Sequence, residues 1–104
     1  MINSKKVQKL INQINKYKSL NYNVIETFQK SGTITYQLNS LSAERENGVL
    51  LIIDEDEKVY EYGCGIMTTM ISSIKNIEFI DDSIILHLES DKIGQATIII
   101  EQLK

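Results

Sequence analysis

The short spacing between strand-length apolar segments constrains this fold more than any other feature. Residues 24–29 and 33–38 are rich in β-branched and aromatic side chains, and three residues separate them. Residues 49–53 form a continuous apolar run, and residues 59–62 follow it after a short acidic stretch. Connections this short join antiparallel neighbours, because a parallel pair needs a crossover of about a dozen residues or more. The sequence therefore predicts a mostly antiparallel sheet.

Three more strands are expected toward the C-terminus, separated by polar turns. They cover residues 76–80, 84–89 and 95–102, where apolar or β-branched residues gather in strand-length segments. Residues 39–48, in contrast, show no regular apolar pattern. We expect this stretch to be a solvated loop.

Two segments have the apolar period of an α-helix. The first has apolar residues at the i, i+3, i+4 and i+7 spacing of one helical face: Val7, Leu10, Ile11 and Ile14. The second covers residues 66–75 and repeats this kind of face with Ile66, Met67, Met70, Ile71 and Ile74. The expected fold is a single α+β domain over residues 1–104, in the order α-β-β-β-β-α-β-β-β, with two helices packed on the sheet.

Charge is distributed unevenly along the chain. Residues 1–30 carry six lysines and one acid, a net charge of +5, whereas residues 31–104 carry five basic and thirteen acidic residues, a net charge of −8. Lys5, Lys9 and Lys16 lie opposite the apolar stripe of the first helix and are candidate phosphate contacts. A single arginine and an overall charge of −3 argue against a dedicated nucleic-acid-binding domain. Direct nucleic-acid binding is therefore an alternative.

The only cysteine, Cys64, lies between Gly63 and Gly65 at the start of the second expected helix. Backbone N–H groups at a helix N-terminus stabilise a thiolate, and the only histidine, His87, could serve as its base. A small thiol enzyme is therefore a further alternative. The other interpretation is a structural cysteine, because no catalytic motif surrounds it and the alternation over residues 84–89 places His87 on a solvated sheet face.

The residue pattern favours no metal and no cofactor. Residues 54–57 are acidic, but an EF-hand loop that begins there would need glycine and glutamate where this chain has Val59 and Gly65. One cysteine and one histidine give little support to a zinc site, and the glycines match no phosphate-binding motif.

The expected location is the cytoplasm. One cysteine cannot form an internal disulfide, which fits a reducing compartment. The N-terminal segment lacks the apolar core of a signal peptide, and the apolar runs are too short to cross a membrane. The abundance of Ile, Lys and Asn, whose codons are AT-rich, indicates a low-GC bacterium or one of its mobile elements.

Acidic residues gather at the expected hairpin tips, where they can attract a basic partner. The candidate partner-binding residues are Asp54, Glu55, Asp56, Glu57, Glu61, Asp81 and Asp82. In size, charge and composition the chain is similar to small phage-encoded inhibitors such as anti-CRISPR proteins, and to toxin-neutralising immunity proteins. This likeness implies a non-enzymatic protein that inhibits or regulates a macromolecular partner with a basic surface, such as a nucleic-acid enzyme. A homodimer also fits the sequence.

Overall fold

The described part of the chain forms two antiparallel sheets and one α-helix. The structure is a computed structural model that describes residues 4–16, 21–39, 41–54, 65–92 and 94–103. Its helices are α1 (Ser4–Lys16) and a short 3-10 helix, η1 (Ile71–Ser73). Its strands are β1 (Asn21–Phe28), β2 (Gly32–Asn39), β3 (Leu41–Glu46), β4 (Val49–Asp54), β5 (Gly65–Met70), β6 (Ile74–Ile80), β7 (Ser83–Ser90) and β8 (Gly94–Leu103).

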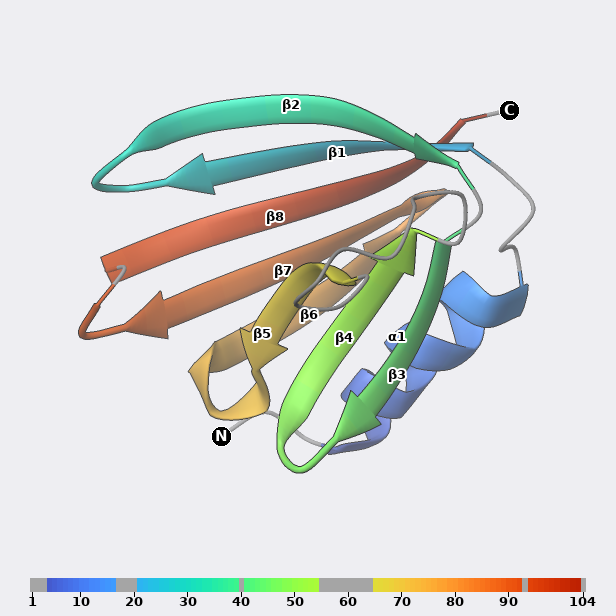
Figure 1. The fold of residues 1–104 in the computed structure, drawn as a ribbon, viewed down its shortest axis with the longest axis horizontal. Helices are drawn as coiled ribbons and strands as arrows, with labels where there is room; N and C mark the ends of the chain where they lie inside the picture. The colour runs from blue at the N-terminus through green and yellow to red at the C-terminus, as the bar shows by residue number, and fades with distance from the viewer. Residues whose placement is uncertain (1–3, 17–20, 40, 55–64, 93, 104) are drawn as a thin grey trace.

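The strands are divided between a larger and a smaller sheet. The larger sheet has the order β2-β1-β8-β7-β6, and the smaller has the order β3-β4-β5. All neighbouring strands run antiparallel. In Figure 1, β2 lies along the upper edge of the larger sheet and β6 belongs to its opposite edge. The α+β class and the antiparallel pairing expected from the short connections are therefore confirmed.

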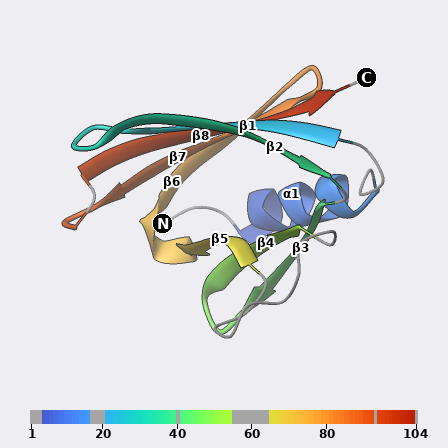
Figure 2. The same ribbon diagram turned by 45° about the horizontal axis from the view of Figure 1, so that its top comes forward.

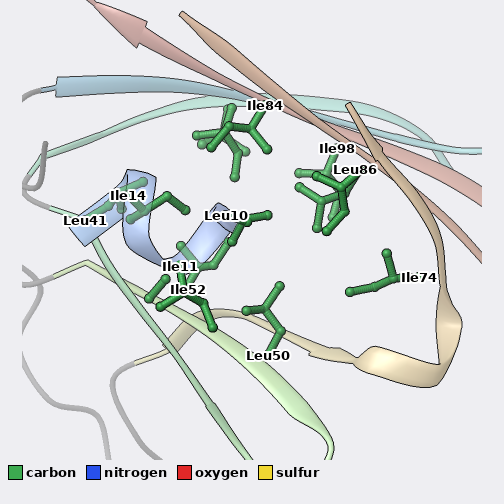
Figure 3. Packing of buried hydrophobic residues seen from close by; sticks show 14 of the residues in the cluster. Leu10, Ile11, Ile14, Leu41, Leu50, Ile52, Ile74, Ile84, Leu86 and Ile98 are labelled. Atoms are coloured by element: carbon green, nitrogen blue, oxygen red, sulfur yellow. The ribbon is translucent and has the colours of Figure 1, made fainter. Parts of the chain in front are cut away.

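The core lies between the larger sheet and a second layer built from α1 and the smaller sheet (Figure 2). All four residues of the predicted α1 stripe are buried. Figure 3 shows Leu10 of α1, Leu50 of β4 and Leu86 of β7 pointing into the same interior space, and each is 0% exposed. Burial of one such side chain contributes about 1.5–3 kcal/mol, so this shared core holds the two layers together.

The prediction of a second helix over residues 66–75 is wrong. The chain forms β5 up to Met70, continues through η1 and enters β6 at Ile74. Within β5, Thr69 is buried but Met70 is 55% exposed, as expected for a strand whose side chains alternate between faces. The apolar spacing resembles a helical face, but the segment is rich in β-branched residues and pairs with β4. This pairing outweighs the local helical pattern.

The expected loop over residues 39–48 contains strand β3. It pairs with β4 through a turn at Asn47 and Gly48, whose φ angles are 50° and 77°. Two positive φ angles match a type I′ hairpin turn, for which Asn-Gly is the preferred sequence. Because β4 has β3 on one side and β5 on the other, the expected pairing of residues 49–53 with residues 59–62 is also wrong. Residues 59–62 themselves lie outside the described part of the chain.

Candidate functional site

Helix α1 presents basic side chains to strand β6. Its apolar stripe packs into the core, so its lysines lie on the exposed side. Lys6 Nζ donates to Asn76 Oδ1 at 2.9 Å and to the carbonyl oxygen of Ile77 at 3.4 Å. Lys9 Nζ lies 4.4 Å from the ring centroid of Phe79, within the range of a cation–π interaction. These two lysines therefore fasten the helix to β6.

The β6–β7 turn presents two adjacent acidic residues. Asp81 and Asp82 are exposed and form the tip of the hairpin, where Ile80 pairs with Ser83. Asp81 has a φ angle of 51°, which aspartate tolerates better than most residues with a side chain. The backbone N–H of Gln102 donates to the carbonyl oxygen of Asp82 at 3.0 Å, so the end of β8 holds the turn in place.

An open hollow of about 580 Å³ lies where α1, the β6–β7 turn and β8 meet. We call it the helix–turn hollow, and the residues that line it are Lys9, Asn12, Gln13, Lys16, Asp81, Asp82 and Gln102. All of them are polar or charged: α1 supplies two lysines and two amides, the β6–β7 turn supplies two carboxylates, and β8 supplies the amide of Gln102. Small-molecule sites are usually enclosed and mostly apolar. An open hollow of mixed charge suits the polar side chains of a protein partner better.

The hollow brings together residues that the sequence had assigned to two different roles. Lys9 and Lys16 are candidate phosphate contacts, whereas Asp81 and Asp82 are candidate partner-binding residues. Lys5 is exposed on the same helix but is not among the lining residues. A phosphate in the hollow would meet the two carboxylates and be repelled by them. The lining of the hollow therefore carries two positive and two negative side chains.

Of the other predicted acidic residues, the structure describes only Asp54. Asp54 is the last residue of β4, a strand of the smaller sheet. The remaining members of the predicted set, Glu55, Asp56, Glu57 and Glu61, lie outside the described residues, as does Cys64. Their roles remain predictions from the sequence.

His87 lies on the outer face of the larger sheet, as the alternation of its strand predicts. Its neighbours Leu86 and Leu88 are buried, whereas the His87 side chain is 39% exposed. The Nε2 atom of His87 lies 2.5 Å from Oε1 of Glu78 on the adjacent strand. The described contacts of this histidine are therefore those of a surface pair. A role as a base for Cys64 remains an untested prediction.

Three residues of the hollow were missing from the sequence-based set: Asn12, Gln13 and Gln102. Asn12 and Gln13 follow Lys9 by three and four residues, and helical spacing alone would have placed them beside it. No local signal identifies Gln102, because its position beside the turn depends on the strand order of the larger sheet.

Metal ligands, membrane helices and known relatives give no further indication of function. In the part of the chain that the structure describes, no three His, Cys, Asp or Glu side chains gather so as to hold a metal ion. No helix among the described residues is long and apolar enough to cross a bilayer. No protein-family model matches the chain, and comparisons with curated proteins and with solved structures found no match either.

Proposed function

We propose that this chain is a non-enzymatic binding protein that inhibits or regulates a protein partner with a basic surface, such as a nucleic-acid enzyme. The observation that carries the proposal is the helix–turn hollow with its two exposed carboxylates. The exposed carboxylate of Asp81 would accept charge-assisted hydrogen bonds from lysine or arginine side chains of the partner, and the negative charge of Asp82 beside it adds to the attraction. The amides of Asn12 and Gln13 both donate and accept hydrogen bonds, so they can satisfy polar groups at the rim of the contact.

The charge of the chain supports a basic partner. Residues 31–104 carry a net charge of −8, and the hollow is bordered by the turn that carries two of these acids. Such a field raises the rate of encounter with a basic protein. An acidic surface can also occupy a groove that normally receives phosphates, which is why a nucleic-acid enzyme fits the proposal.

The experiment is affinity capture from cells of the source, with a matched pair of variants. One variant carries Asp81→Asn and Asp82→Asn, which remove both charges but keep the side-chain shape, and asparagine tolerates the positive φ of position 81. The control carries Glu44→Gln and Glu46→Gln, two exposed positions on β3 that remove the same amount of charge elsewhere. Mass spectrometry identifies what each protein retains.

We expect the wild type and the control to retain one basic protein, and the hollow variant to lose it. With the purified partner, the association rate should fall as salt rises, because screening limits electrostatic attraction to about 8 Å at physiological ionic strength. Equal capture by all three proteins would contradict a role for the hollow. Capture that disappears after nuclease treatment would instead favour nucleic-acid binding by α1.

A further inference from the structure

Strand β2 forms an open edge of the larger sheet. It pairs with β1 along its whole length, from Asn39 opposite Asn21 to Gly32 opposite Phe28, without a register shift. No described strand pairs with its other side, and Figure 1 shows it along the rim of the sheet. In an antiparallel pair, the N–H and C=O groups of alternate residues point away from the partner. β2 therefore presents a row of such groups outward.

β2 lacks the features that usually prevent an edge strand from pairing. Its eight residues, GTITYQLN, include no charge and no proline, and no bulge interrupts the strand. Ile34 is 57% exposed, which is more than Met70 or Ile80, the other large hydrophobic side chains that are exposed among the described residues. Thr33 and Thr35 beside it are also exposed. A long, neutral and β-branched edge of this kind is suited to the addition of another strand.

We propose that β2 of a second copy of this chain covers this edge, paired antiparallel about a two-fold axis. Each copy carries a net charge of −3, so the repulsion between two copies is smallest when the surfaces that meet carry no charge. β2 is such a surface, because no like charges are placed opposite one another when all eight residues are neutral. A strand with charged side chains would meet no opposite charges on β2. An identical neutral strand needs none, so it can pair without leaving a charge unpaired.

The two-fold symmetry also restricts which residues meet. Residues directly opposite each other in an antiparallel pair lie on the same face of the sheet. Gly32, Ile34, Tyr36 and Leu38 share this face, and a register that sets Ile34 opposite Gly32 would pair only residues 32–34. Any longer pairing places Ile34 opposite Ile34, Tyr36 or Leu38 of the second copy, all of which have large apolar or aromatic side chains. Pairing covers the exposed Ile34 and adds about eight backbone hydrogen bonds over strands of this length.

The proposed dimer goes beyond the proposed function and leaves the helix–turn hollow open. The lining of the hollow comes from α1, the β6–β7 turn and β8, and none of it comes from β2. Because β2 and β6 lie at opposite edges of the sheet, the joint sheet would have a β6 edge at each end. A dimer with two hollows would bind a partner that has two basic sites more tightly than a monomer would.

The test uses sedimentation velocity over a range from micromolar to near-millimolar protein, with one variant at each edge. Ile34→Lys places a charge on β2, and Ile80→Lys places the same charge on β6 at a residue that is 49% exposed. We expect the wild type to dimerise, and Ile34→Lys to raise the dimer dissociation constant by about tenfold or more. Ile80→Lys should leave it unchanged. Circular dichroism of both variants at low concentration checks that the fold is retained.

Amide hydrogen exchange provides a second measurement that does not depend on substitution. Protection of β2 amides should increase with protein concentration, while β6 amides should not change. A wild type that stays monomeric over the whole range would overturn the proposal. So would a dimer that Ile80→Lys disrupts and Ile34→Lys does not. Protection of β2 that appears only after a different protein is added would assign the edge to that protein and not to a second copy.

Discussion

The β6 edge and the β2 edge belong to the same sheet but meet their surroundings differently. At β6, a register shift between Ile74 and Asn76 interrupts the pairing with β7, and Lys6 of α1 donates to the carbonyl oxygen of Ile77. At β2, the pairing with β1 is continuous and no residue is charged. Bulges and lysines are features with which proteins block strand addition, so β6 is protected and β2 is open.

The charged side chains follow the same division. β6 carries Lys75 and Glu78, and the turn after it carries Asp81 and Asp82, whereas β2 carries no charge. Charged surfaces accelerate binding to partners of opposite charge, and neutral edges pair through their backbone. The two proposed interactions therefore use different parts of the sheet: the charged partner is proposed at the β6 side and the second copy at the β2 side.

The largest expected difference is between a buried isoleucine of the core and the exposed isoleucine of the β2 edge. Ile14 of α1 is 0% exposed, whereas Ile34 of β2 is 57% exposed. Ile14→Ala should lower the free energy of unfolding by about 2–5 kcal/mol, because it empties a buried site. Ile34→Ala should change it by less than about 0.5 kcal/mol at a concentration where the chain is monomeric. Urea denaturation measures both, and similar losses would show that Ile34 is packed within the monomer.

A smaller difference in stability should come from substituting two glycines, one at the start of β2 and one in the β3–β4 turn. Gly32 starts β2 with a φ of 98°, and Gly48 precedes β4 with a φ of 77°. A Cβ at either position meets nothing within 4 Å, so the cost of alanine is the strained backbone alone, about 1–2 kcal/mol. Hydrogen exchange should show that Gly32→Ala loosens β2 and that Gly48→Ala does not. Equal loosening of β2 by both would mean that the edge unfolds only with the whole domain.

Tyr36 should make the β2 side sensitive to alkaline pH. Burial raises the pKa of its hydroxyl above the usual value, and the hydrogen bond to Glu26 and the Glu26 charge raise it further. Since the folded state holds the proton more tightly, this contribution is fully present below the unfolded pKa of about 10 and is lost as pH rises toward the folded pKa. Thermal melts should therefore show falling stability above about pH 10.

Tyr36→Phe is the matched control for this pH effect, because phenylalanine keeps the ring but cannot ionise. In an absorbance titration of the folded wild type, Tyr36 should ionise above the usual tyrosine pKa of about 10, and the variant should lack this late component. An alkaline loss of stability that is the same in the variant would assign the effect to other residues.

Local patterns were sufficient to predict much of the fold. The stripe of α1 and strands β1, β2, β6, β7 and β8 follow from apolar spacing and turn residues within short segments. β5 was missed because Met70 and Ile71 fit a helical stripe, and only pairing with β4 resolves the ambiguity. β3 was missed because its second half is charged and exposed. The Asn47–Gly48 sequence is nevertheless typical of the hairpin turn that follows this strand.

The candidate site was predictable only as separate halves. Helical spacing places Lys9 and Lys16 on one exposed side of α1, and the turn residues Asp81 and Asp82 stand out by their charge. Lys16 and Asp82 are 66 residues apart in the chain, and they border one hollow only because of how α1 and β6 are packed. No local pattern contains that packing, so the hollow required the structure.

The smallest expected effect concerns how firmly α1 is fastened at the β6 edge. In a double-mutant cycle with Lys9→Met and Phe79→Leu, the interaction between the ammonium group and the ring should contribute about 0.5–1 kcal/mol. Lys92→Met, an exposed lysine in the β7–β8 turn, paired with Phe79→Leu should show no coupling. If Lys9 and Phe79 also show none, the lysine is available to phosphates. The described contacts that fasten α1 to β6 would then be the hydrogen bonds of Lys6 to Asn76 and Ile77.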